Sequence, residues 1–349
     1  MRGITWALPL LLLASSCALG AGVPPARTPP SAAPAPAVEA DVTTTTAVAA
    51  STTTTSTTTT TTTAPKQRIV VRGTGDVNLD PDYTTGLRAN GYAHAWSGLE
   101  GLFAEDDLTI VNLECSPSPL GTPAWKQFVF RCPDGLDEMR DAGVDVANLA
   151  NNHGQDYGKE AMLDGRRRLL DAGILPVGVG DDVAGANAPA IVEVGGWTIA
   201  VVGLGGVVPD PGWFATETSP GMSDGDDVGS MVAAVRRADE LADLVFVTIH
   251  WGVELDTRPR QEDVERARAM IAAGADGIFG HHSHRLNPLE YVDGVPVAWG
   301  LGNFVWPRQS DASATTAVAE IVVEPDGSTS ARLIPAFIVE SGHPVLVDR

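Results

Sequence analysis

Side chains that can bind metal ions or move protons recur at the points where short apolar runs of this sequence end. Five of the seven histidines lie at such points, together with carboxylates and amides. In α/β proteins with open sheets, ligands bind beyond the carboxyl ends of the strands. We therefore expect these residues to meet at one site. They are Asp76, Asn78, Glu114, Asn152, His153, His250, His281, His282, His284 and Asn303.

The donor types of this set indicate a transition-metal site, because imidazole, carboxylate and amide donors without thiolates suit Mn, Fe, Zn or Ni. Alternate residues of an extended segment point to the same side. We therefore expect His282 to face the same point as His284, and Asp76 the same point as Asn78, while His281 would point away. Each residue alone is equally typical of a turn, a cap or a structural histidine. Six donors fit two ions that share a carboxylate. These six are Asp76, Glu114, Asn152, His250, His282 and His284.

The apolar runs alternate with segments of helical character. Glycine follows three of the predicted helices, at Gly143, Gly173 and Gly274, where a left-handed residue would end each helix. Strands that alternate with helices indicate an α/β fold with buried sheets. The predicted strands occupy residues 69–71, 108–113, 145–149, 199–204, 244–249, 277–279 and 296–301, and Asn303 follows the last of them. The clearest predicted helices occupy residues 138–142, 159–172, 231–242 and 262–273.

The first 65 residues differ in composition from the rest of the chain. Residues 1–20 are typical of a secretory signal peptide, with Arg2 before an apolar stretch. Two outcomes of processing fit: a lipoprotein anchored through Cys17, or ordinary secretion or a retained N-terminal anchor. Residues 21–65 are rich in Pro, Ala and Thr and predict a disordered linker. We expect a folded domain over residues 66–349, exported and tethered outside the cytoplasm.

Acidic residues dominate the charge of the chain. Asp and Glu number 44 against 23 Lys and Arg, for a formal net charge of −21. This balance excludes a basic face for binding nucleic acid without sequence preference, and it argues against tight binding to anionic lipid. No apolar run reaches the roughly 20 residues that a membrane span needs. We therefore expect contact with a membrane only through the N-terminal segment.

Three cysteines are too few for a disulfide scaffold or a cysteine-rich zinc protein. Apart from Cys17, only Cys115 and Cys132 remain. In an exported protein such a pair is often bonded, and here the bond would hold the segment before Cys132 against the strand that ends at Glu114. The alternative is two reduced, buried thiols.

These motifs, taken in order, resemble those of the CapA-like family of poly-γ-glutamate capsule biosynthesis proteins, which is related to calcineurin-like metallophosphoesterases. The resemblance covers nearly all of residues 68–306. It implies a four-layer α/β/β/α sandwich around a dinuclear metal site, and a role in the synthesis of a capsule or envelope polymer. The matching segments are Gly75-Asp76-Val77, Asn112-Leu113-Glu114, Asn151-Asn152-His153 with Asp156-Tyr157-Gly158, His250-Trp251-Gly252 with Glu254, Gly280-His281-His282-Ser283-His284 and Leu301-Gly302-Asn303-Phe304.

The resemblance also implies a role for each matching residue. Asp76 and His284 would bind one metal, and Glu114 would bridge the two. The second metal would take His250 and His282, Asn152 would be the amide ligand, and His153 would protonate or stabilise the leaving oxygen. Two positions depart from the phosphoesterase pattern, because Asn78 stands where a ligand histidine is usual and Glu114 where an aspartate is usual.

Charged residues near these motifs have two interpretations each. Lys126 and Arg131 either contact an anionic group of the substrate or are solvated cations. Asp156 and Glu254 either orient the histidines or are surface acids. For the whole protein we consider a metal-dependent phosphatase or phosphodiesterase, a non-catalytic factor for polymer assembly or export, and a hydrolase of amide bonds. The expected partners are an anionic envelope polymer or phosphoester and the capsule synthesis machinery.

Overall fold

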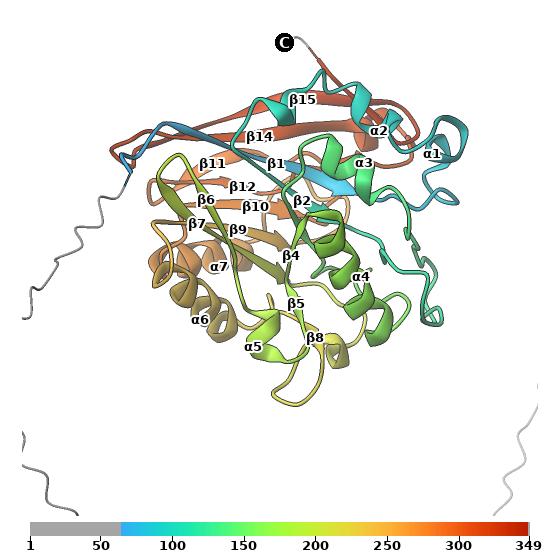
Figure 1. The fold of residues 1–349 in the computed structure, drawn as a ribbon, viewed down its shortest axis with the longest axis horizontal. Coiled ribbons are helices and arrows are strands. Elements are labelled where there is room, and N and C mark those ends of the chain that lie inside the picture. The colour runs from blue at the N-terminus through green and yellow to red at the C-terminus, as the bar shows by residue number, and fades with distance from the viewer. Residues whose placement is uncertain (1–63, 348–349) are drawn as a thin grey trace, which may run out of the picture. The chain divides into compact units, whose positions relative to one another are not determined.

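The computed structural model describes residues 64–347, which form two β-sheets with helices on their outer faces (Figure 1). The first sheet has eight strands, in the order β16-β15-β14-β1-β2-β3-β4, and β13 pairs with the end of β1. Strands β1 to β4 and β13 are parallel, whereas β14 to β16 form an antiparallel extension. Their bounds are β1 Ile69–Val77, β2 Leu108–Leu113, β3 Val146–Asn148, β4 Leu175–Val177, β13 Asn303–Val305, β14 Thr315–Val323, β15 Thr329–Glu340 and β16 His343–Leu346.

The second sheet has six strands, in the order β11-β12-β10-β9-β7-β6. Its four central strands are parallel, and an antiparallel strand pairs at each edge. The bounds are β6 Ala190–Val194, β7 Trp197–Gly205, β9 Leu244–His250, β10 Gly277–His281, β11 Leu289–Val292 and β12 Val295–Ala298. A separate two-stranded ribbon joins β5, Val179–Gly180, to β8, Gly221–Met222.

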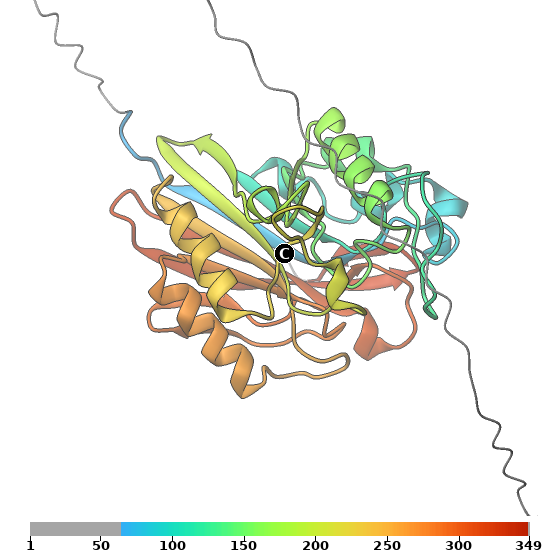
Figure 2. The same ribbon diagram turned by 90° about the horizontal axis from the view of Figure 1, so that it is seen from below.

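Three apolar clusters hold four layers together. The cluster between the sheets includes Ile110, Val201 and Phe279, all fully buried. A second cluster packs Met231 and Met270 of two helices against the second sheet, and a third packs other helices against the first sheet. Figure 2 shows α6 and α7 side by side on the outer face of the second sheet. The predicted four-layer α/β/β/α sandwich is therefore confirmed. The helices are α1 Thr85–Asn90, α2 His94–Ser97, η1 Leu102–Ala104, α3 Leu136–Asp141, α4 Lys159–Ala172, α5 Val183–Ala186, η2 Pro211–Trp213, α6 Val228–Asp239, α7 Gln261–Ala272 and α8 Asp311–Ala314.

The predicted strands and helices correspond to elements of the structure, and β2 and α4 have the predicted bounds. Gly143, Gly173 and Gly274 all adopt positive φ angles just past a helix, as expected. One expectation was wrong: Asn303 does not follow the last strand. It begins β13, and three further strands follow it. These strands do not follow the α/β repeat, because they are antiparallel and the helix before β14, α8, is only four residues long.

The N-terminal predictions fall largely outside the described residues. The signal peptide, Cys17 and nearly all of the proposed linker precede residue 64, so they remain predictions. Within the residues that the structure describes, no helix is long and apolar enough to cross a membrane.

Candidate metal centre

The predicted donors come together at one edge of the sandwich, where strands of both sheets end. Asp76 lies near the end of β1, and Glu114 directly follows β2. On the facing sheet, His250 and His281 are the last residues of β9 and β10 and lie opposite each other in register. All four residues are buried. The parallel order of the strands is what places these side chains together, because the carboxyl ends of parallel strands share an edge.

Close approach of the backbone at this edge requires glycine. A Cβ atom on Gly75 would lie 2.2 Å from the carbonyl oxygen of Gly302, and Gly302 itself has φ of +71°. This contact lets β13 pair with β1, and it brings Asn303 into register with Asp76.

Glu114 lies at the centre of the cluster. Its Oε1 atom is 3.7 Å from Nε2 of His250, 3.8 Å from Nε2 of His284 and 3.9 Å from Nε2 of His153. These separations are too long for hydrogen bonds, but the atoms all point toward a common space. Neither carboxylate oxygen of Glu114 has a hydrogen-bond partner among the described residues.

Asp76 is the second carboxylate of the cluster, and it is held by its neighbours. Oδ1 accepts a hydrogen bond of 2.9 Å from Nδ2 of Asn112, and Oδ2 lies 3.2 Å from Nδ1 of His284. Nδ1 of His281 is 3.6 Å from Oδ1. His281 therefore faces the cluster, and its Nε2 bonds to the hydroxyl of Thr248 at 2.9 Å.

Two overlapping sets of donor atoms are close enough to hold a metal ion each. One set is Glu114, His282 and His284, and the other is Asp76, Glu114 and His250; the atoms of each set lie within 4.8 Å of one another. Glu114 belongs to both, as a bridging carboxylate would. The grouping differs from the one implied by the family resemblance, which placed His284 with Asp76 and His282 with His250.

Unpartnered polar atoms show that this donor set fits metal ions. Besides both oxygens of Glu114, the Nδ1 atoms of His281, His282 and His284 are buried without a hydrogen-bond partner among the described residues. Buried polar atoms in native proteins are nearly always satisfied. A cluster of unsatisfied lone pairs and imidazole nitrogens is what a divalent cation would complete.

The backbone at the histidine motif is not extended as we expected. His282 and His284 adopt φ angles of +83° and +51°, in the left-handed region that non-glycine residues rarely occupy. The two rings still converge, with centroids 6.0 Å apart. Their convergence therefore comes from two strained residues and not from the alternation of a strand. Such strain costs about 1–3 kcal/mol per residue and concentrates at functional sites.

His153 is held beside the cluster by its own set of contacts. Its Nδ1 atom lies 2.7 Å from Oδ2 of Asp156, and its ring stacks on Phe130 with centroids 4.2 Å apart. Lys126 forms an ion pair with the buried Asp156 and lies 3.2 Å from Nδ1 of His153. Asp156 and Lys126 therefore contact His153 directly, and Nε2 of His153 is the ring nitrogen that faces the donors.

Asn152 and His250 contact each other, with 2.9 Å between Oδ1 and Nε2. Asn112, to which the sequence analysis gave no role, lies 3.1 Å from Nδ1 of His250 and donates to Asp76. Alternation along β2 was a signal for it, because Asn112 and Glu114 are two residues apart. Asn151 donates in turn to Asn112 at 3.2 Å, and forms a further layer behind the site.

Four other predicted residues lie outside the donor cluster. Asn78 uses Oδ1 to accept from the backbone N–H of Asp80, so it shapes a turn. The guanidinium of Arg131 donates to backbone carbonyls and stacks over Tyr157. Asn303 donates to the carbonyl of Ser313. Glu254 is exposed, and both interpretations of it, as an orienter of the histidines and as a surface acid, stay predictions.

Burial dominates the electrostatics of the cluster. It raises the pKa of Glu114 well above the ordinary value, and the nearby charge of Asp76 raises this pKa further. Burial lowers the pKa of His281 and of His282 to about 4, and it lowers that of His250 well below the usual range. Burial would also raise the pKa of Asp76, but the nearby imidazoles of His284 and His281 and the amide of Asn112 together outweigh it, so the net pKa is lowered. His250, His281 and His282 are therefore neutral at pH 7, the form that binds metals.

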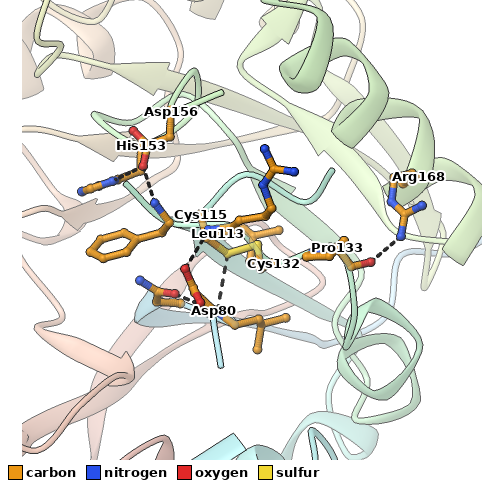
Figure 3. Close-up of a disulfide and its surroundings, with 12 residues drawn as sticks. Asp80, Leu113, Cys115, Cys132, Pro133, His153, Asp156 and Arg168 are labelled. Atoms are coloured by element: carbon orange, nitrogen blue, oxygen red, sulfur yellow. Dashed lines mark hydrogen bonds and ion pairs between the residues drawn. A yellow bond between two sulfur atoms is a disulfide. The ribbon is translucent and has the colours of Figure 1, made fainter. Parts of the chain in front are cut away.

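The predicted disulfide between Cys115 and Cys132 is present (Figure 3). It joins the residue after Glu114 to the segment that carries Phe130, two residues before Cys132. The backbone N–H of Phe130 donates to Asp156 at 2.6 Å. The disulfide thus fixes the segment that supports His153.

This chain is similar to known proteins of capsule synthesis. The statistical model of the bacterial capsule synthesis protein PGA_cap matches residues 70–308. The PGA biosynthesis protein CapA of Bacillus subtilis is 32% identical over 209 residues, 60% of this chain and 54% of that protein. The capsule biosynthesis protein CapA of Bacillus anthracis is 32% identical over 212 residues, 59% of this chain and 50% of that protein.

The chain thus spans about half the length of these curated relatives. Among solved structures, the NAD nucleotidase of Haemophilus influenzae aligns with a TM-score of 0.45 and 15% identity, over 78% of this chain and 50% of that one. Since the family model covers well over half of its residues, this chain belongs to the bacterial capsule synthesis protein family PGA_cap.

Proposed function

We propose that this protein acts in the synthesis of a capsule or cell-envelope polymer, and that its folded domain binds two divalent transition-metal ions and uses them to hydrolyse or transfer a phosphoester. One observation carries this proposal: Glu114 is fully buried, neither of its oxygens has a hydrogen-bond partner within residues 64–347, and it lies within 4 Å of three imidazole nitrogens. Burying a carboxylate without partners costs free energy, and a bound cation would offset that cost. The family membership supports the assignment to polymer synthesis.

The residues of the site have different proposed roles. Asp76, Glu114, Asn152, His250, His282 and His284 would hold the ions. When bound, two such ions polarise a phosphoryl oxygen and lower the pKa of a bound water. His153 would deliver a proton from Nε2 to the leaving oxygen. Asp156 accepts from Nδ1 of His153, which keeps the ring oriented and stabilises its protonated form.

We also propose that the protein is exported and held at the cell surface through the N-terminal segment, by lipidation of Cys17 followed by the linker. The disulfide between Cys115 and Cys132 supports export, because disulfides persist in oxidising compartments and are rare in the cytoplasm. An anionic envelope polymer or phosphoester and the capsule synthesis machinery are the proposed partners. The net charge of −21 opposes a long polyanion at this domain unless the metal ions offset it locally.

A second candidate function is non-catalytic: a factor for polymer assembly or export that uses the metal site for binding. The side chain of Asn78 favours it. Asn78 stands where the phosphoesterase pattern has a ligand histidine, and its Oδ1 is committed to the N–H of Asp80. The centre therefore has one imidazole fewer than that pattern provides.

Metal analysis combined with a substrate screen separates the two functions. The protein is supplied with Mn, Fe, Zn or Ni, its bound metal is counted, and it is assayed on p-nitrophenyl phosphate, the corresponding diester and a glutamyl peptide. We expect close to two ions per chain and turnover of a phosphoester. Turnover of the peptide alone would indicate an amide hydrolase. Metal binding without any turnover, together with retention of glutamate polymer, would favour the assembly factor. No bound metal at all would refute the centre.

A further inference from the structure

A pocket of about 200 Å³ opens beside the metal centre and shares His153 and His284 with it. Pockets that enclose a whole small molecule usually measure about 300–1,000 Å³. This one is therefore sized for one part of a substrate whose reacting group lies at the metal centre. Because His153 lines the pocket, the part that lies there is the one that departs when the ester is cleaved.

Four aromatic side chains line the pocket, from Tyr83, Phe128, Phe130 and Trp306. Tyr83 lies 4.4 Å from Phe130 and 5.6 Å from Trp306, measured between ring centroids, and the second contact is edge-on. Phe130 and Trp306 are buried, whereas Phe128, at the mouth, is 51% exposed. Rings that pack against one another are already in place before a ligand binds. The wall therefore offers a preformed apolar surface to a flat or apolar group.

Two charged side chains, Arg285 and Glu254, line the same pocket. Nη1 of Arg285 donates to the backbone carbonyl of His284 at 2.7 Å, which fixes the direction of the guanidinium. Neither side chain forms an ion pair within the described part of the chain, with the other or with a third residue. Arg285 is half-buried, whereas Glu254 is exposed and its charge is screened by solvent. The oriented cation therefore outweighs the acid as a binding group.

We propose that this pocket binds the leaving group of the substrate, and that Arg285 selects leaving groups that carry an anionic group. The proposal rests on the proposed function, because it takes His153 as the group that protonates the leaving oxygen. It assigns the substrate class as a phosphoester whose alcohol part has an apolar face against Tyr83 and Trp306 and a negative charge within reach of Arg285. Glu254 at the rim disfavours a second negative charge.

Three matched esters test the assignment on the full-length, metal-loaded protein: phenyl phosphate, 4-carboxyphenyl phosphate and 4-(aminomethyl)phenyl phosphate. We expect the carboxylate ester to have the highest kcat/KM and the ammonium ester the lowest. Arg285→Gln should reduce the ratio of kcat/KM between the carboxylate and phenyl esters by about 10- to 100-fold, the loss expected for a charged hydrogen bond. Arg285→Lys should retain part of the preference, and Glu254→Gln should increase it.

Arg268→Gln is the matched control, because it removes the same charge from an exposed position on α7. It should leave the ratio unchanged. An equal loss on all three esters in Arg285→Gln, or a preference for the ammonium ester, would overturn the proposal.

A binding measurement separates this proposal from the proposed function. Affinities of phenol, 4-hydroxybenzoate and 4-(aminomethyl)phenol for the full chain are measured by calorimetry, which needs no turnover. If no ester is cleaved but 4-hydroxybenzoate binds best and loses that preference in Arg285→Gln, the catalytic function fails and the anion pocket stands. If the esters are cleaved but the three phenols bind equally, the function stands and the pocket assignment fails.

Discussion

Two glutamates of this protein are buried in opposite ways. Glu320, on β14, is 5% exposed, and it accepts hydrogen bonds from Arg72 at 2.6 and 3.0 Å and from Arg332 at 2.7 Å. Glu114 is fully buried, and neither of its oxygens has a partner among the described residues. The pKa of Glu320 is lowered, whereas that of Glu114 is raised well above the ordinary value.

The difference shows what each carboxylate does. The charge of Glu320 is balanced within the fold, so this residue contributes to the packing of β14 against β1 and β15. The charge of Glu114 has no such balance, and its burial costs free energy in the metal-free protein. At neutral pH, a cation that binds to this carboxylate offsets that cost. Comparing variants at the two positions therefore separates a residue kept for stability from one kept for function.

The largest effect is expected from Glu114→Gln. Removing the bridging charge should abolish binding of both metal ions and all turnover that depends on them. In the metal-free protein the same change should raise the free energy of unfolding by about 1–2 kcal/mol, because a neutral amide is less costly to bury than a carboxylate. Metal content by mass spectrometry and thermal unfolding with and without a chelator measure the two effects.

Asp76→Asn is the matched control for this prediction. Asp76 already has hydrogen-bond partners, so its neutralisation should weaken metal binding without stabilising the metal-free protein. A Glu114→Gln protein that is less stable than the wild type without metal would contradict the comparison.

The contrast between His153→Ala and His282→Ala is the next largest. His153 is held by Asp156 outside both donor sets, so His153→Ala should keep close to two metal ions while kcat falls by roughly 10²–10⁴-fold. His282→Ala should instead remove one ion and leave the fold intact, since His282 lies in the loop after β10. Metal counts and phosphoester turnover on the two variants distinguish an acid from a ligand. If His153→Ala loses metal as completely as His282→Ala, His153 is a ligand.

The order of strands and helices in the central part of the fold could be predicted from sequence because three buried parallel strands, β2, β3 and β9, are short apolar runs, each followed by a helix that ends near a glycine with positive φ. Leu108–Leu113 and Lys159–Ala172 show this most clearly. The antiparallel strands β14 to β16 could not be predicted in this way. Their position beside β1 depends on pairing between residues more than 200 positions apart, such as Ile69 and Val323, and no local pattern encodes that pairing.

The members of the candidate site could be proposed from sequence for a similar reason, since strand ends of one sheet edge must meet. The backbone at His282 and His284 could not, because left-handed φ angles at histidine arise from tertiary constraint. The sequence also did not show which charged side chains contact the metal centre. Lys126 and Arg131 lie in one loop, yet Lys126 contacts Asp156 and His153 whereas Arg131 is held by carbonyls of residues 119–121.

Removing the disulfide should have a smaller effect, and mainly on stability. Cys115 and Cys132 are 17 positions apart, and closing a loop of that length stabilises a protein by about 3 kcal/mol in the chain-entropy model. Cys115→Ala with Cys132→Ala should lower the free energy of unfolding by about that amount in denaturant titrations. Since Phe130 lies beside the bridge and supports His153, kcat should fall more than metal content does. Equal stability of the two proteins would contradict this prediction.

The smallest effect, and the clearest in its pH dependence, is expected from Glu320→Gln. The change should lower the free energy of unfolding by about 2 kcal/mol, less than for a fully buried pair, because the side chain of Arg332 is 69% exposed and Arg72 keeps its contact with Asp106. Burial would raise the pKa of Glu320, but the hydrogen bonds from Arg332 and Arg72 lower it below 4.5. The stabilisation is therefore complete above pH 4.5 and is lost as the pH falls through the lowered pKa.

The pH dependence of stability at Glu114 has the opposite sign: its raised pKa means that the metal-free protein loses stability as the pH rises above 4.5. Denaturant titrations of both variants and the wild type from pH 3 to pH 8, with a chelator present, should show the Glu320→Gln difference shrinking toward acid and the Glu114→Gln difference growing toward neutral pH. Parallel pH profiles for the two variants would show that the two carboxylates do not differ in the way their contacts indicate.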